Sequence, residues 1–294
     1  MATQDLDASA PVVPNTDPPA PGLDLGSLFR DAPAGRARLV RTVAALCRDP
    51  GYFSISNLGV DPALFEGVLT QAARFFTRPD DDPIKTRVHN RLSPGGVGWG
   101  PLFQEPAYQP GTVAHLESFD VSPPQAWIGD EALAAGLGIY PNQWPALDGF
   151  EEAVAALYLA LRRTSDALFE VFAEVLGAPR DFFRTRATHR APSTMRLLHY
   201  PGQARPASAS NVGIAAHTDF ECFTMMFQTA AGLEVTDTAG VWRRAPARPG
   251  EVLVILGDML ERLSNGAFKA TGHRVTITPW PRYAVILFNA LDGD

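Results

Sequence analysis

One feature constrains the possible fold and function of this chain more than any other. It is a set of two histidines, an aspartate and an arginine in the last third of the sequence. His217 and Asp219 stand at positions i and i+2, and side chains with that spacing on a β-strand point to the same face. His273 follows far enough along the chain for a β-barrel to be crossed and re-entered, and Arg282 comes shortly after it. Two imidazoles and one carboxylate on one side of a metal leave coordination positions open, as in mononuclear non-haem iron sites. The pattern therefore predicts an iron site with an anchor for a co-substrate.

The length and composition are consistent with one large acidic domain, or with one domain that carries an additional helical region. The chain has 294 residues, of which 46% are hydrophobic and 19% charged, enough to bury a substantial core. The net charge is −7 and no basic stripe is present, so nucleic acid is not expected as a partner. Two cysteines cannot form a disulfide framework, which indicates a reducing compartment. Without a visible signal peptide or membrane-spanning apolar run, we expect a cytoplasmic protein that makes no membrane contact.

The first two thirds of the sequence favour helices with a few short strands. Residues 1–22 are rich in proline and alanine without periodicity, and we expect a disordered lead-in there. Apolar positions repeat with a helical period in 35–47, 62–78 and 145–176. Strand-like patterns occupy 23–29, 52–56 and 117–121. Residues 79–144 show no clear pattern otherwise, and the glycine-rich 93–100 is predicted to be a loop because it lacks the lysine and context of a phosphate-binding loop.

From Thr194 onward the sequence changes to short strand-like runs separated by turn residues. The candidate strands are 195–200, 224–228, 232–236, 241–242, 251–256 and 283–288. Their spacing is typical of a jelly roll. We therefore predict a mixed α/β (α+β) fold with a lead-in (1–22), a mixed, mostly helical region (23–190) and a β-barrel core (191–294). No flexible linker separates the last two, which we expect to form one compact unit.

Each candidate residue is weak evidence by itself, because His-x-Asp is common on exposed strands and a single histidine is more often structural. The surroundings add weight. Asp219 lies between the apolar segments 213–216 and 223–227, where a charged carboxylate is costly unless it is paired or binds a metal. His273 is likewise followed by a strand-like segment. The combination therefore favours a metal site.

The ordered series of segments resembles the isopenicillin N synthase-like family of Fe(II)- and 2-oxoglutarate-dependent oxygenases. In the N-terminal half, residues 49–60 are similar to the family's GFF…NHG segment, with Leu58 in place of the histidine, and 73–76 also fits. The similar segments of the C-terminal half are, in order, 195–201, 217–219, 232–235, 257–260, 263–266 and 271–275. The series covers nearly the whole chain after the lead-in and is far more specific than any one of its members.

The resemblance implies a double-stranded β-helix, or jelly roll, with the N-terminal helices packed on it. His217, Asp219 and His273 would bind Fe(II). Arg282 matches the arginine of the family's Arg-x-Ser motif, which holds the distal carboxylate of 2-oxoglutarate, and Tyr200 matches a tyrosine that donates a second hydrogen bond to it. A guanidinium suits this role because it presents a fixed fork to a carboxylate and stays charged when buried.

The implied activity is that of an oxidoreductase, an Fe(II)/2-oxoglutarate-dependent dioxygenase. It would use O2 to oxidise an unactivated C–H bond of a small molecule, by hydroxylation, desaturation or cyclisation, and release succinate and CO2. The iron centre would do the chemistry, and no separate acid or base is assigned. Natural-product biosynthesis is suggested by analogy. The substrate and the oligomeric state stay open.

Two departures from the family pattern keep alternatives open. Ala284 replaces the serine of Arg-x-Ser, which removes a hydroxyl donor worth about 1–3 kcal/mol. The chain ends at Asp294, soon after the Arg282 strand, so we expect an open cavity or one closed by another segment or subunit. In one alternative, Arg282 binds the substrate's own carboxylate in an Fe(II) oxidase that needs no co-substrate. In another, the protein is a non-catalytic β-roll binding protein.

Overall fold

The computed structural model describes residues 20–29, 33–105, 108–125, 127, 139–188, 190–203 and 211–292. The predicted lead-in of residues 1–22 lies outside this part of the chain except for its last three residues. Of these, Ala20 is buried and Gly22 begins the first strand, which runs parallel to its neighbour.

Two sheets of unequal size pack face to face. The larger has the strand order β1-β2-β12-β9-β14-β6-β5-β3 and the smaller β11-β10-β13-β8, with a separate parallel pair β4-β7. The larger sheet consists of β1 (Gly22–Asp24), β2 (Tyr52–Ser56), β3 (Gly98–Gly100), β5 (Glu117–Val121), β6 (Met195–Tyr200), β9 (Phe223–Gln228), β12 (Val252–Leu256) and β14 (Arg282–Asn289). The other strands are β8 (Ile214–His217), β10 (Leu233–Thr236), β11 (Trp242–Arg244), β13 (His273–Val275), β4 (Val113–Ala114) and β7 (Asn211–Val212). This is the expected jelly roll, and its larger sheet is built from both halves of the chain.

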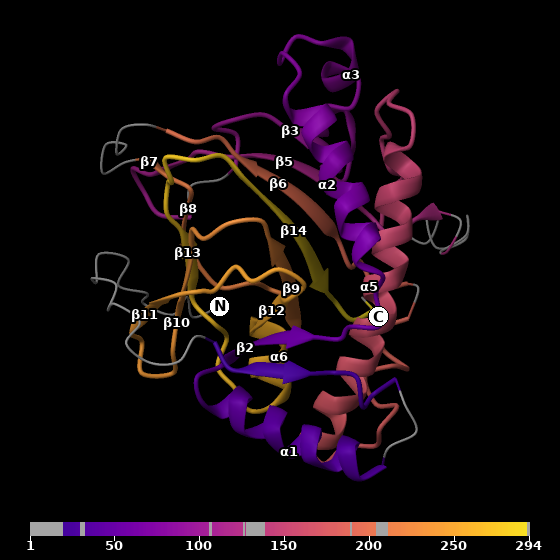
Figure 1. The fold of residues 1–294 in the computed structure, drawn as a ribbon, viewed down its shortest axis with the longest axis vertical. Helices are drawn as coiled ribbons and strands as arrows, with labels where there is room; N and C mark the ends of the chain where they lie inside the picture. Colours follow the sequence, from indigo (N-terminus) through magenta and orange to yellow (C-terminus); the bar gives the residue numbers. More distant parts are fainter. Residues whose placement is uncertain are drawn as a thin grey trace.

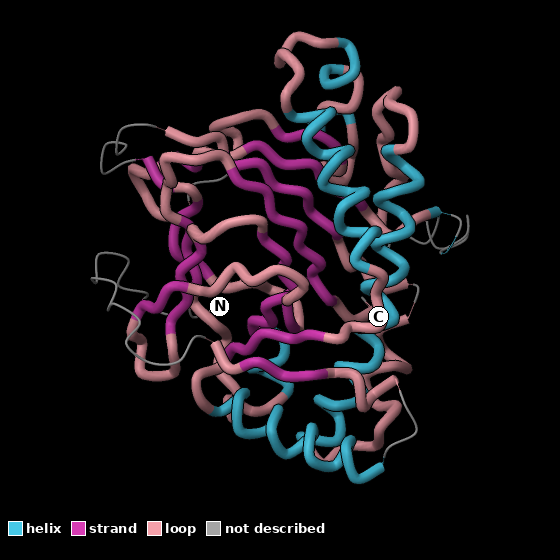
Figure 2. Tube along the Cα trace, viewed as in Figure 1, coloured by secondary structure: helices cyan, strands magenta, loops and turns pink. Residues whose placement is uncertain are grey.

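Helices cover the outer face of the larger sheet and one of its ends. They are α1 (Pro33–Arg48), α2 (Pro62–Phe76), α3 (Pro83–Thr86), the 3-10 turn η1 (Asn90–Leu92), α5 (Phe150–Val175) and α6 (Asp258–Leu263). Figure 1 shows α2 and α5 side by side along the sheet, and α1 across the end near β1 and β2. Figure 2 shows the same division, with strands gathered on one side and the long helices on the other.

The long helices form close to where their patterns place them, and local signals explain their ends. Asp61 caps α2, because its carboxylate accepts a hydrogen bond from the Ala63 amide, and Pro62 follows at the first helical position. α5 begins at Phe150, later than predicted, because Gly149 adopts a left-handed conformation (φ 80°) that a helix cannot contain.

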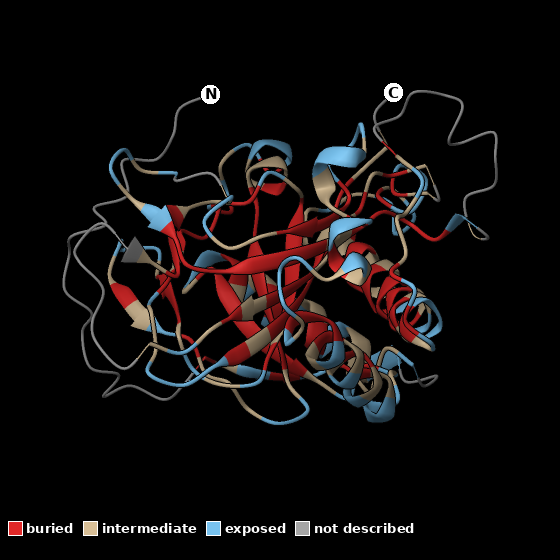
Figure 3. Ribbon diagram, turned by 90° about the horizontal axis from the view of Figure 1, so that it is seen from above, coloured by how far each residue is buried: buried red, intermediate tan, exposed pale blue. Residues whose placement is uncertain are grey.

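Strand alternation sorts the apolar side chains of the larger sheet into two layers. On β14, Val285 and Leu287 join the cluster beneath the helices, whereas Ala284 and Ile286 join the cluster between the two sheets. Adjacent residues point to opposite faces of a strand, so one sequence serves both layers. Figure 3 shows the result: buried strands run through the centre, and the helices expose only their outer faces.

Two expectations about the N-terminal part are wrong in detail. The glycine-rich segment is not entirely a loop, because Gly98–Gly100 forms β3 and pairs with β5. A Cβ at Gly98 would lie 2.3 Å from the carbonyl oxygen of Val88, so the strand needs glycine there and shows no apolar alternation. The strand expected over 23–29 ends at Asp24, and turn residues follow it.

Replacing Phe75 should destabilise the protein strongly. Phe75 is fully buried, and its ring contacts those of Phe76, Phe119 and Phe150 where α2 meets α5 and the sheet. Phe75→Ala should lower the free energy of unfolding in urea by about 3–5 kcal/mol, because it removes apolar contacts and leaves a cavity. The control Leu92→Ala, at a side chain 63% exposed, should change it little. A loss below about 1 kcal/mol for Phe75→Ala would contradict this packing.

Candidate metal centre

His217 and His273 are neighbours on adjacent strands of the smaller sheet. His217 is the last residue of β8, His273 is the first of β13, and the two are directly paired in the antiparallel register. Their ring centroids lie 4.0 Å apart. The sheet therefore brings together two side chains that are far apart in the sequence.

Asp219 reaches the histidines from a turn, not from a strand. β8 ends at His217, so the expected i, i+2 strand geometry does not hold at Asp219. The turn is held instead by its own hydrogen bonds. The backbone amide of Asp258 donates to the Asp219 carbonyl (2.8 Å), and the Thr224 hydroxyl donates to Oδ2 of the Asp219 carboxylate (2.5 Å). This leaves Oδ1 facing the histidines.

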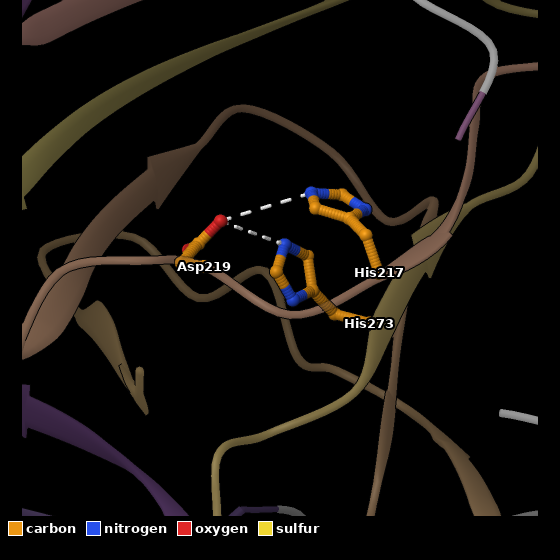
Figure 4. Close-up of side chains that lie close together, drawn as sticks. All are labelled: His217, Asp219 and His273. Carbon is orange, nitrogen blue, oxygen red and sulfur yellow. Dashed lines mark ion pairs between the residues drawn. The ribbon is translucent and has the colours of Figure 1, made fainter. Parts of the chain in front are cut away.

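The three side chains converge on one point, as Figure 4 shows. Oδ1 of Asp219 lies 3.7 Å from Nε2 of His217 and 3.6 Å from Nε2 of His273. Ligand atoms of all three lie within 4.8 Å of one another. These separations are wider than hydrogen bonds and leave space for an ion between the donors.

The backbone holds both imidazoles in the form that binds a metal. Nδ1 of His217 lies 2.8 Å from the Ala215 carbonyl oxygen, and Nδ1 of His273 lies 3.1 Å from that of Thr271. A carbonyl oxygen only accepts, so each Nδ1 carries a proton and Nε2 is the nitrogen that each ring can offer to a metal. Burial and the neighbouring His273 lower the pKa of His217, which keeps that ring neutral. Two imidazoles and one carboxylate fit Fe(II).

Arg282 is a buried cation at the far end of the same barrel. Only 2% of it is exposed, and burial lowers its pKa. Among the described residues it has no carboxylate partner: Nη1 donates to the Gln228 side-chain oxygen (3.3 Å) and the buried Nε has no partner. A Cβ at Gly232 would lie 2.7 Å from that Nε, so glycine admits the side chain. Buried charges without a counter-ion are costly, so this site fits an anionic ligand.

Tyr200 lies against Arg282. The two residues are cross-strand partners on β6 and β14, and the Arg282 guanidinium carbon lies 4.0 Å from the Tyr200 ring centroid. Ala284, where the family pattern has a serine, is opposite Gln228 on β9. The Gln228 amide nitrogen donates to the Pro246 carbonyl, which directs its oxygen to Arg282. Gln228 thus orients the guanidinium without neutralising it.

A cavity of about 340 Å³ adjoins the triad and Tyr200. The three triad residues and Tyr200 line it, together with Tyr108, Asp120, Arg196, Phe220, Glu221 and Phe288. The Tyr108 ring stacks on that of His217, with centroids 4.4 Å apart and planes 5° from parallel. His115 is not among the described lining residues; it stacks on Phe103 and contacts Gln203.

Of the residues predicted from the sequence, His217, Asp219, His273 and Tyr200 line one cavity, and Arg282 packs against Tyr200. The sequence analysis did not identify the supporting residues Thr224 and Gln228 or the cavity residues Arg196 and Tyr108. Thr224 and Gln228 share the inward face of β9 with Met226, so alternation within that apolar run was the signal available. Tyr108 follows from no local pattern.

Known families match both halves of the chain. The 2OG-Fe(II) oxygenase superfamily matches residues 191–290, and the N-terminal region of the non-haem dioxygenases of morphine synthesis matches residues 20–147. Among the described residues, no helix is both long and apolar enough to cross a membrane.

The chain is also similar along most of its length to individual members. It is 31% identical to the 2-oxoglutarate-Fe(II) type oxidoreductase hxnY of Emericella nidulans (87% of this chain, 74% of the relative). It is 29% identical to the 2-oxoglutarate-dependent dioxygenase citB of Monascus ruber (93% and 84%). A solved structure of a 2OG-Fe(II) oxygenase family protein from Caulobacter crescentus superposes with a TM-score of 0.79 at 27% identity (94% and 87%). The chain therefore belongs to the 2OG-Fe(II) oxygenase superfamily and is an Fe(II)- and 2-oxoglutarate-dependent dioxygenase.

Proposed function

We propose that His217, Asp219 and His273 bind the Fe(II), that Arg282 with Tyr200 binds the distal carboxylate of 2-oxoglutarate, and that a small molecule is oxidised at the other end of the cavity. The observation that supports this most is the pairing of two incomplete sites in one barrel. A convergent His-Asp-His set faces a cavity, and a buried arginine beside the cavity residue Tyr200 has no anionic partner among the described residues.

In this proposal the protein's own residues hold the metal and the co-substrate in position and exclude water from them. The Ala215 and Thr271 carbonyls fix the rings of His217 and His273, and Thr224 fixes the Asp219 carboxylate. Arg282 offers two or more N–H donors to one carboxylate in a nearly water-free barrel, where such hydrogen bonds are strong. The apolar cavity residues Met226 and Ile286 help to keep water from the co-substrate.

When bound, Fe(II) and 2-oxoglutarate supply the oxidising power: O2 is consumed, the co-substrate leaves as succinate and CO2, and a C–H bond of the substrate is oxidised. The protein decides which C–H bond that is, because it holds the substrate beside the metal.

Removing a triad residue should abolish iron binding. His217→Ala takes one of the three protein donors, so purified protein should fall from about one iron per chain to a tenth or less, measured by metal analysis. His89→Ala is the matched control, since His89 caps η1 and does not line the cavity. If His217→Ala retains its iron, the ligand assignment is wrong.

Replacing Arg282 should weaken 2-oxoglutarate binding without loss of iron. Arg282→Met removes a buried, charge-assisted contact worth about 3 kcal/mol, so the Kd for 2-oxoglutarate, measured by titration under anaerobic conditions, should rise roughly 100-fold or more. Arg163→Met, on the exposed face of α5, should leave it unchanged. An unchanged Kd in Arg282→Met would mean that another group holds the co-substrate.

The product stoichiometry separates the proposed reaction from the alternative oxidase. With an accepted substrate, about one succinate should form for each O2 consumed, as measured by chromatography and an oxygen electrode. A substrate that is turned over with no succinate would instead mean that Arg282 serves the substrate's own carboxylate.

A further inference from the structure

Three contacts hold the Arg282 side chain, and none of them comes from an anionic group. The centroid of the Tyr200 ring lies 4.0 Å from the guanidinium carbon, and the Gln228 side-chain oxygen accepts a hydrogen bond from Nη1 (3.3 Å). Gly232 lies so close that a Cβ there would be 2.7 Å from Nε. The guanidinium is therefore fixed in position while no carboxylate among the described residues compensates its charge.

Gln228 is itself fixed by the protein. It is 6% exposed and ends β9, and its amide nitrogen donates to the Pro246 carbonyl oxygen (2.9 Å). A carbonyl oxygen only accepts, so this bond decides that the oxygen of the Gln228 amide faces Arg282. A reversed amide would set its N–H groups against the N–H groups of the guanidinium. Gln228 therefore presents a single, well-oriented acceptor to the arginine.

The strand register leaves room for this acceptor beside the guanidinium. Ala284 is the register partner of Gln228, and it stands two residues after Arg282 on β14. Residues i and i+2 of a strand share a face, so Ala284 and Arg282 lie on the inner face together. Because Ala284 has only a methyl group, the space next to the guanidinium is left to the longer side chain of Gln228.

A glutamate at this position would have almost the same shape and the opposite effect on the arginine. Its carboxylate can accept the same hydrogen bond from Arg282, and in a buried setting it would form a strong ion pair. That pair would satisfy the charge that otherwise attracts an anionic ligand. The neutral amide of Gln228 thus positions the guanidinium without competing with a carboxylate for it.

We propose that Gln228 is a positioning residue for 2-oxoglutarate, and that the neutrality of its amide keeps the Arg282 charge available for the distal carboxylate. The proposal rests on the proposed function, because that assigns this carboxylate to Arg282. Loss of the acceptor frees the guanidinium to turn and weakens binding moderately, whereas a negative charge at position 228 occupies the guanidinium and blocks binding. If only the shape of the side chain mattered, the glutamate variant would be the milder of the two.

The variants Gln228→Met and Gln228→Glu separate the hydrogen bond from the charge. The full-length protein is loaded with Mn(II) under anaerobic conditions, and the Kd for 2-oxoglutarate is measured by calorimetry. Gln228→Met should raise the Kd about five- to tenfold, because one hydrogen bond to the arginine is lost. Gln228→Glu should raise it roughly 100-fold or more, as far as Arg282→Met does. Both variants should bind as much Mn(II) as the parent protein.

The melting temperature of the metal-free protein without 2-oxoglutarate is the second measurement. Gln228→Glu should raise it by about 3 °C, because it gives the buried guanidinium a counter-ion, whereas Gln228→Met should not raise it. The rise should disappear in the double variant that also carries Arg282→Met. A variant that melts at a higher temperature and yet binds 2-oxoglutarate far more weakly is not explained by a merely structural role of Gln228.

Gln71 provides a matched control away from the cavity. Its side-chain oxygen accepts from Nη1 of Arg74 (2.9 Å), and its amide nitrogen donates to the Asp148 carbonyl oxygen (3.2 Å). These are the same two kinds of contact that Gln228 makes, but they lie at the surface of α2, where an ion pair contributes little. Gln71→Glu should leave the Kd for 2-oxoglutarate and the Mn(II) content unchanged.

The proposal would be overturned by an unchanged Kd in Gln228→Glu, by a larger rise in Gln228→Met than in Gln228→Glu, or by a lower melting temperature of Gln228→Glu than of the parent. Arg282→Met, measured in the same series, tests the proposed function separately. If it binds 2-oxoglutarate as tightly as the parent, Arg282 does not hold the co-substrate and the proposed function is wrong. If it weakens binding while Gln228→Glu does not, only the role of Gln228 is wrong.

Discussion

The pairing of His217 with His273 across β8 and β13 is the contact on which the rest of the site depends. An antiparallel register holds two imidazoles 4.0 Å apart, although β9 to β12 and α6 lie between them in the sequence. Asp219 then needs only a short turn to complete the set, and the Thr224 hydroxyl and the Asp258 amide fix that turn. A shift in the register of this strand pair would separate the two imidazoles and abolish the metal site.

Strand alternation keeps the chemistry and its support on different faces of the larger sheet. Tyr200 points into the barrel toward Arg282, while its neighbour His199 points the other way, where it stacks on Tyr283 and lies 2.8 Å from the Glu117 carboxylate. Glu117 also pairs with the fully buried Lys85. A buried charge network on the outer face is thus satisfied within the protein, whereas Arg282 on the inner face has no anionic partner among the described residues.

Sequence patterns were sufficient to predict the regular, periodic helices and strands. They failed where a single tertiary contact decides the local structure. The helices α1, α2 and α5 and most strands of the barrel followed from apolar spacing, capping residues and turns. Apart from the strand 117–121, the stretch 79–144 did not, because β3 is made of glycines around one tryptophan and Tyr108 is placed by stacking on a histidine far along the chain. Yet this stretch supplies Glu105 and Asp120, which neutralise Arg196 and so set the charge of the cavity.

The sequence by itself determined the class of fold and identified the proposed ligand set and Arg282, since strand periodicity and donor chemistry follow from residue types and their order. Only the tertiary structure decided how these groups are used. It placed Asp219 on a turn, left Arg282 without a counter-ion among the described residues, and gave Arg196 two. The physical reason is that the electrostatic role of a charged side chain depends on its buried neighbours, and those neighbours come from strands that are distant in sequence.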